Sequence, residues 1–210
     1  MKIPFTKIVL KCKTFIKKRV KYIDDQFGVY LITGKQGSNK TYYSIQLTVD
    51  QEKSRVNYIK TNIHSLNIPG YKIEYFTKIK EIYNDTDKNV IYIIDEVSKK
   101  YPKDSKCDKD FYAWMQQSRK RNRIAILITQ EYLELPMWIR RPCKYMLTSM
   151  PIKLITRFTG IYKCVVGDGY NLVYDKEEGI YTCPPVQYIF YKRNELIGSY
   201  YDTFEPIEDL

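Results

Sequence analysis

The 210-residue sequence contains one histidine, His64, and five cysteines with no CxxC pair among them. A structural zinc site needs four His or Cys ligands at short spacings, and an odd number of cysteines does not suit a disulfide framework. The sequence therefore predicts neither, and its cysteine usage fits a reducing compartment. A hydrolase that pairs a nucleophile with a histidine base would depend on His64, which lies in a polar stretch, so that class of enzyme is not expected.

Long apolar runs are also missing. No stretch of about 18 apolar residues occurs, so we predict no membrane-spanning helix. The basic N-terminus lacks the apolar core of a secretory signal. With 44% hydrophobic and 28% charged residues the composition is globular. A chain of this length can form one domain without a disulfide or a structural metal.

Positive charge is in excess. The sequence has 35 Lys or Arg against 24 Asp or Glu, a net charge of +11, which argues for a polyanionic partner. Residues 1–21 contain eight of these cations and no acid, and residues 3–20 place apolar side chains three and four apart. We predict a basic amphipathic helix within residues 1–24, compatible with peripheral membrane contact, with nucleic acid, or with packing on the domain. A second acid-free stretch, residues 135–167, is either an anion-binding surface or an ordinary solvated face.

Hydrophobic periodicity predicts an α/β fold. Short apolar, β-branched runs predict strands at 28–33, 55–62, 71–76, 89–94 and 124–129, and helical patterns fall at 40–53, 77–84, 111–119 and 136–141. The alternation predicts a mainly parallel sheet flanked by helices, with residues 25–141 as its core. Residues 142–210 are predicted to be a β-rich extension of the same domain, with strand signals at 145–150, 162–166, 171–174 and 180–183 and a closing helix at 193–201.

A glycine-bearing loop lies between the first strand and the first helix of this core. Gly34–Thr41 reads GKQGSNKT, close to the Walker A pattern G-x-x-x-x-G-K-[ST] in the strand–loop–helix context that the motif requires. In such a loop the backbone N–H groups surround a polyphosphate, the lysine reaches the outer phosphates and the threonine hydroxyl binds Mg²⁺. The residues predicted to bind nucleotide are Gly34, Lys35, Gln36, Gly37, Ser38, Asn39, Lys40 and Thr41, with Thr41 also as a metal ligand.

One position departs from the pattern. Asn39 replaces the glycine that normally precedes the lysine. Asparagine tolerates left-handed backbone angles better than most residues, so we expect the loop shape to survive. The departure leaves open a P-loop protein with slow or no turnover.

Two further strands end in polar residues. The apolar run at 90–94 is followed by Asp95 and Glu96, the form of a Walker B motif, in which the first acid holds Mg²⁺ and the second polarises the attacking water. The run at 124–128 leads to Gln130, either a sensor of the terminal phosphate or a simple strand-end hydrogen bonder. Arg119 lies within a basic stretch, either as a guanidinium offered to a neighbouring subunit's nucleotide or as a solvated helix end.

Together these segments resemble the FtsK–HerA superfamily of P-loop DNA-pumping ATPases, over about residues 28–204. Two branches are similar: the genome-packaging ATPases of membrane-containing viruses, and the zonular occludens toxin-like assembly proteins of filamentous phages. The second branch is indicated by residues 114–120, 126–130, 138–141 and 200–203.

The resemblance implies a RecA-like, FtsK–HerA-like P-loop NTPase fold, ATP and Mg²⁺ as ligands, and Lys40, Glu96, Arg119 and Gln130 as catalytic residues, with Asp95 on the metal. It also implies a homo-oligomeric ring, often a hexamer, with DNA in its channel, and a virion vertex or assembly proteins as partners.

Three functions remain open at this stage. The first is packaging of viral DNA in the host cytoplasm or at the virion. We favour it because the toxin-like branch typically continues into a membrane-spanning helix, and we predict no such helix in this sequence. The second is phage extrusion at the host inner membrane. The third is a catalytically weak P-loop module that binds DNA.

Overall fold

The computed structural model describes residues 27–51, 56, 58–171, 173–175, 180–203 and 205. The amphipathic helix predicted within residues 1–24 lies outside the described residues. Within them, no helix combines the length and the apolar character needed to cross a bilayer.

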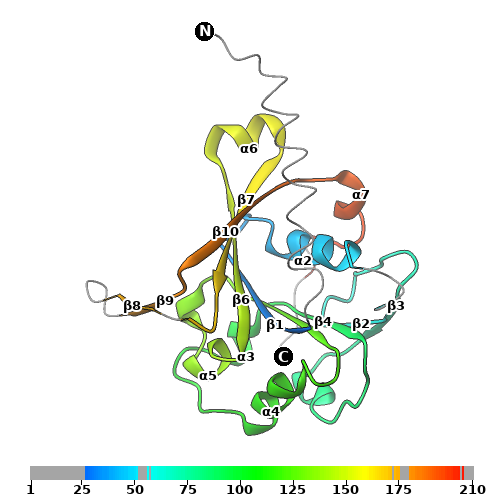
Figure 1. Cartoon of the computed structure of the whole chain (residues 1–210). Coiled ribbons are helices and arrows are strands. Elements are labelled where there is room, and N and C mark those ends of the chain that lie inside the picture. Colours follow the sequence, from blue (N-terminus) through cyan, green and yellow to red (C-terminus); the bar gives the residue numbers. More distant parts are fainter. Residues whose placement is uncertain are drawn as a thin grey trace.

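One large sheet organises the molecule (Figure 1). Its eight strands lie in the order β10-β7-β6-β1-β5-β4-β2-β3. They are β1 (Gly28–Thr33), β2 (Tyr58–Thr61), β3 (Lys72–Tyr75), β4 (Val90–Ile94), β5 (Ile124–Ile128), β6 (Cys143–Pro151), β7 (Ile161–Asp168) and β10 (Pro185–Lys192). The six strands from β6 to β3 pair in parallel, whereas β7 pairs antiparallel with both β6 and β10. The predicted α/β fold with a mainly parallel sheet is confirmed.

Helices cover both faces of the sheet, and the alternation of side chains along each strand explains why. In β1, Tyr30 and Ile32 pack on one face, whereas Val29 and Leu31 pack on the other. The first face is covered by α2 (Lys40–Val49) and α7 (Glu195–Gly198). The second is covered by the 3₁₀ turn η2 (Ile79–Ile82) and the helices α3 (Val97–Lys100), α4 (Lys109–Gln117) and α5 (Met137–Arg140). A sheet buried on both faces accounts for the uninterrupted apolar strands in the sequence.

The predicted strands and helices of residues 28–141 are present with shifted ends. The helix expected at 40–53 ends at Val49, and that expected at 111–119 begins at Lys109, where the Asp108 side chain caps it by accepting from the Asp110 and Phe111 N–H groups. The short 3₁₀ turn η3 (Tyr132–Glu134) precedes α5.

Two elements of the C-terminal third were not predicted. The helix α6 (Lys153–Thr159) joins β6 to β7 and ends at Gly160, whose φ of 65° is left-handed. It was not predicted because its Ile and Thr residues are β-branched and are typical of strands. The eight-residue strand β10 begins at Pro185, next to a second proline that suggests a turn. The short strands β8 (Val173–Asp175) and β9 (Ile180–Thr182) form a separate hairpin.

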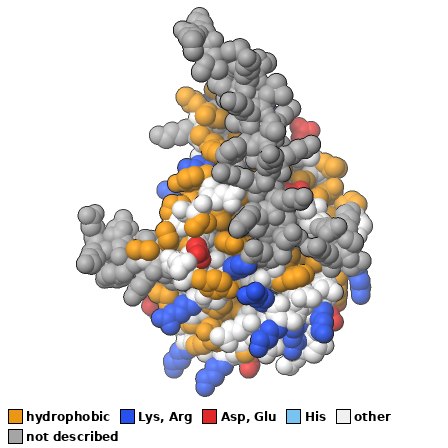
Figure 2. All heavy atoms as spheres, in the orientation of Figure 1, with side chains coloured by type: hydrophobic (Ala, Val, Ile, Leu, Met, Phe, Trp, Pro, Cys, Tyr) orange, Lys and Arg blue, Asp and Glu red, His pale blue; other side chains and the backbone are white. Residues whose placement is uncertain are grey.

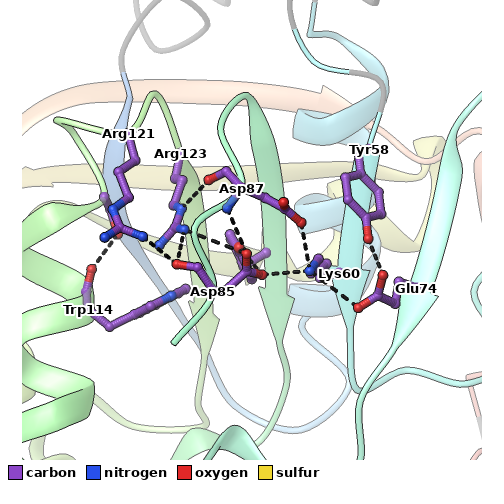
Figure 3. A network of polar contacts seen from close by, with 10 residues as sticks. Tyr58, Lys60, Glu74, Asp85, Asp87, Trp114, Arg121 and Arg123 are labelled. Carbon is purple, nitrogen blue, oxygen red and sulfur yellow. Dashed lines mark hydrogen bonds and ion pairs between the residues drawn. The ribbon is translucent and has the colours of Figure 1, made fainter. Parts of the chain in front are cut away.

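A buried ionic network holds the amino edge of the sheet (Figure 3). The Lys60 ammonium lies 2.6 Å from Asp85 and 2.9 Å from Asp87. The fully buried Arg123 guanidinium donates to the backbone oxygens of both aspartates, at 2.5 and 2.8 Å. The Tyr92 hydroxyl donates to Asp85 at 2.7 Å. The network joins β2, β4 and the residue before β5 to the loop before β4.

Candidate functional site

The polar residues that follow β1, β4 and β5 meet at one edge of the sheet. These strands are parallel neighbours, so their carboxyl ends coincide. The Thr41 hydroxyl donates to Asp95 Oδ2 at 2.7 Å, and the Gly34 N–H donates to the Gln130 carbonyl at 3.0 Å. A cleft of about 420 Å³ opens here. It is lined by Gln36, Gly37, Asn39, Lys40, Thr41, Asp95, Glu96, Thr129 and Gln130, among others.

The loop before α2 has the backbone conformation that its sequence requires. Asn39 adopts φ 63° and ψ 36°, so the expected left-handed conformation is confirmed. At Gly34, with φ +149°, an added Cβ would lie 2.4 Å from both the Ser149 carbonyl oxygen and the Ser38 hydroxyl. Only glycine fits this position, where the loop is pressed against β6.

The first turn of α2 presents donors to the cleft. The Asn39 side chain makes no capping hydrogen bond, so within the described residues it leaves the first N–H groups of this ten-residue helix to other acceptors. The buried Asn39 amide nitrogen has no hydrogen-bond partner among the described residues. Together with Lys40 these donors could bind phosphate oxygens, which the positive end of the helix dipole would favour.

The charges in the cleft suit a nucleotide with a divalent cation. Burial lowers the pKa of Lys40, opposed by the nearby Asp95 and Glu96 carboxylates. Burial also raises the pKa of Asp95, against the stabilising hydrogen bonds from the Thr41 hydroxyl and the Glu96 N–H. A buried carboxylate beside a hydroxyl, both oxygen ligands, is the donor set that Mg²⁺ takes next to a phosphate. The residues present therefore fit both a polyphosphate and Mg²⁺.

Glu96 lies beside Asp95 in a strained backbone conformation. Its φ of 55° is left-handed, which is uncommon for glutamate, and its carboxylate pairs with Lys99 on α3. Strain of this kind persists where the surrounding structure holds a side chain in a required place. Here it holds the Glu96 carboxylate at the wall of the cleft.

Several residues that shape the site were not found from the sequence. The Asn62 side chain brackets Asp95, accepting from its N–H at 2.8 Å and donating to its carbonyl at 3.0 Å. The Ser149 hydroxyl of β6 donates to the Ser38 carbonyl at 2.5 Å. Asn62 follows a strand, which is a weak signal, whereas nothing in the sequence marks Ser149.

The segment after α7 also lines the cleft, through Tyr201, Asp202, Thr203 and Glu205. It is fixed to the loop after β2, because the Ser65 N–H donates to the Glu205 carboxylate at 2.9 Å and the Asn67 N–H donates to the Tyr200 carbonyl at 2.7 Å. These contacts join residues far apart in the sequence, so no local pattern reveals them.

Arg119 is not part of this cleft. It lines a separate cavity of about 470 Å³ with Lys120, Arg141 and Gly28, the first residue of β1. Gly34, by contrast, directly follows the other end of that six-residue strand. A strand of this length spans about 20 Å, so Arg119 and the cleft lie at opposite edges of the sheet.

Comparison with known proteins identifies relatives. The family model described as "Zonular occludens toxin (Zot)" matches residues 28–174. Among proteins with curated descriptions, none matches the sequence.

Solved structures also resemble the chain. The N-terminal domain of zonular occludens toxin from Neisseria meningitidis superposes with a TM-score of 0.59 at 18% identity, over 84% of this chain and 100% of that domain. The genome packaging NTPase B204 from Sulfolobus turreted icosahedral virus 2, solved with ATP-gammaS, gives a TM-score of 0.49 at 13% identity, over 76% of this chain and 98% of that one. The first of these supports the P-loop NTPase fold expected from the sequence.

Proposed function

The chain belongs to the zonular occludens toxin family, and from this we propose that it is a P-loop ATPase whose hydrolysis of ATP moves phage DNA during virion assembly and extrusion. The family match favours extrusion over capsid packaging. Packaging, which the sequence alone favours, stays a prediction.

One contact carries the proposal. The Thr41 hydroxyl and the Asp95 carboxylate, 54 positions apart in the sequence, lie 2.7 Å apart in one cleft with Lys40 and Glu96. Had the loop and the two acids occupied different edges of the sheet, one nucleotide could not have reached both. Their proximity supports a single site for the triphosphate and its metal.

Each residue of the cleft has a proposed task. The loop N–H groups and the Lys40 ammonium bind the phosphates and balance the charge that develops in the transition state. Glu96 accepts a proton from the attacking water, and the Gln130 amide orients that water. Thr41 and Asp95 would hold Mg²⁺, which would neutralise charge on the phosphate oxygens.

Arg119 and the excess of positive charge support a ring of subunits that contacts DNA. Because Arg119 lies at the edge of the sheet opposite the cleft, it fits a guanidinium that reaches a neighbouring subunit's nucleotide in a ring, the hexamer expected from the resemblance. The Lys and Arg excess supports contact with DNA phosphates, which is independent of sequence and weakens with salt.

The test is ATP hydrolysis by the full chain, with and without double-stranded DNA and with Mg²⁺ or a chelator. Lys40→Ala should lower the rate roughly 10²–10³-fold and Glu96→Gln roughly 10²–10⁴-fold. Lys88→Ala, an exposed lysine before β4, is the matched control and should not change it. Equal hydrolysis by all of these variants would exclude the cleft as the catalytic site.

The assays with DNA test whether ATP hydrolysis is coupled to DNA. We expect added DNA to raise the rate, with a stimulation that declines steeply as salt increases. Hydrolysis that does not respond to DNA would contradict a DNA motor while leaving the ATPase intact. Nucleotide binding without hydrolysis would favour the catalytically weak module.

A further inference from the structure

An exposed apolar surface lies at the end of the β6–β7 hairpin, on α6. Leu154, Ile155 and Phe158 are 67%, 52% and 80% exposed. Positions four and three apart on a helix share one side, so the three side chains form a single surface, which we call the apolar tip. The proposed ATPase does not use these residues.

The shape of the molecule sets the apolar tip apart. Figure 1 shows α6 at the end of the long β6–β7 hairpin, far from α4 and α5. In Figure 2 apolar side chains gather at this end of the molecule, with Lys and Arg side chains next to them. Three large apolar side chains exposed together on one turn of helix indicate a binding surface.

The segment that carries the apolar tip has charges of one sign. Residues 135–167, which include all of β6 and α6, contain no Asp or Glu. Arg157 is exposed on α6 itself. Lys192 pairs with Ile161 across the base of the helix, and the neighbouring Arg193 N–H donates to the Gly160 carbonyl at 3.0 Å. The nearest acid on this neighbouring segment is Glu195, on α7.

This chemistry favours one occupant. A single turn of helix offers far less than the roughly 800 Å² per partner of a stable protein interface, so a second copy of the chain is a poor fit. DNA phosphates would use the cations but leave Leu154 and Phe158 in water. An anionic bilayer can contact both the apolar side chains and the cations, because its interface takes apolar side chains and its headgroups attract cations.

We propose that α6 inserts Leu154, Ile155 and Phe158 into the interface of an anionic phospholipid membrane, with Arg157 on the headgroups. The contact is peripheral and separate from any made by residues 1–21. It does not depend on the proposed ATPase activity.

Co-flotation of the full chain with vesicles tests this. We expect binding to vesicles of phosphatidylcholine with phosphatidylglycerol and little binding to phosphatidylcholine alone. The double variant Leu154→Ser, Phe158→Ser should bind at least roughly tenfold more weakly, since each buried side chain contributes an order of magnitude or so. Arg157→Gln should weaken binding about fivefold.

Val186→Ser is the matched control. Val186 is 58% exposed on β10, at the end of that strand where Pro185 pairs with Gly167, far from α6. This variant should bind vesicles like the wild type. ATP hydrolysis without vesicles should be unchanged in the double variant, which shows that the variant is folded and separates this test from that of the ATPase.

Phe158→Trp gives a direct readout without a disruptive change. Its additional tryptophan emission, compared with the wild type, should be quenched by lipids brominated in the acyl chains when phosphatidylglycerol is present. Wild-type vesicle binding by the double variant would overturn the proposal, as would the absence of quenching of that additional emission, or equal binding to both lipid mixtures. Loss of self-association with unchanged vesicle binding would also overturn it, in favour of a second copy of the chain.

Discussion

At the scale of single residues, Asn39 shows how a departure from a motif is accommodated. Its φ of 63° is accessible to Asn and Gly, whereas an alanine pays roughly 1–2 kcal/mol for the left-handed region. We expect Asn39→Gly to stay within about 1 kcal/mol of the wild-type free energy of unfolding and Asn39→Ala to lose about 1 kcal/mol.

Urea unfolding measures both variants. Asn84→Ala, at an exposed asparagine whose φ is not positive, is the control and should change little. If Asn39→Ala were as stable as Asn39→Gly, the backbone conformation of residue 39 would have to differ from that described.

The backbone strain at Glu96 predicts that stability and activity respond in opposite directions to its replacement. Its left-handed φ is strained, and its pairing with Lys99 contributes little because both side chains are partly exposed. Glu96→Gly should therefore raise the free energy of unfolding, by up to about 1 kcal/mol, while abolishing ATP hydrolysis. Glu96→Gln keeps the strain and should lose activity without gaining stability. Equal thermal midpoints for the two variants would refute stored strain.

Local sequence patterns predict most of the residues that line the candidate site. Gly34–Thr41 and Asp95–Glu96 directly follow strands that the apolar pattern predicts, and Gln130 lies two positions after another. Parallel strands bring such ends together. Asn62, Ser149 and Tyr201 reach the site through contacts between distant segments, which local sequence patterns do not predict.

At the scale of elements, the ionic network at the amino edge of the sheet makes stability depend on pH. Burial alone would raise the pKa of Asp85, but hydrogen bonds from Lys60, from the Tyr92 hydroxyl and from the Asp87 N–H outweigh it and hold the pKa below its ordinary value. A carboxyl whose pKa is lowered by folding stabilises the fold above the unfolded pKa, near 4, and loses that contribution as the pH falls through the folded pKa.

The test compares urea unfolding of the wild type and Asp85→Asn across this range. The variant should be less stable at neutral pH, and the difference should shrink as the pH falls from about 4. Asp104→Asn, at an exposed aspartate, should follow the wild type throughout. A difference that stays constant with pH would show that the Asp85 charge does not stabilise the fold.

Sequence periodicity does not predict all the elements of the C-terminal third. Between Cys143 and Lys192 the structure contains two long antiparallel strands that pair with β7, and also the helix α6. A seven-residue helix spans only two turns, too few for a helical period to stand out from β-branched residues. The pairing of β6 with β1 joins segments far apart in the sequence, so no local pattern predicts it.

At the scale of the whole molecule, the separation of Arg119 from the cleft predicts complementation between subunits. In the proposed ring, Arg119→Ala subunits would keep an intact cleft but lack the arginine for their neighbour, whereas Lys40→Ala subunits would have the reverse defect. Each variant alone should lose most activity, roughly 10³-fold or more for the arginine. Mixing the two should restore part of it.

Steady-state ATPase assays of mixed subunits measure this recovery. Lys120→Ala, next in the chain to Arg119, is the control and should keep activity if only Arg119 reaches the nucleotide. Mixtures no more active than their components would leave Arg119 as a structural or DNA-facing residue.

The short path from Ser149 to α6 fixes an orientation. Ser149 hydrogen-bonds the loop at Ser38, β6 ends two residues later at Pro151, and α6 begins at Lys153. A molecule resting on a bilayer through α6 would thus turn the carboxyl edge of its sheet, where ATP would be cleaved, toward the lipid and its Arg119 edge away from it. The cleft would then lie close to the point of attachment, on the side of the molecule that faces the lipid.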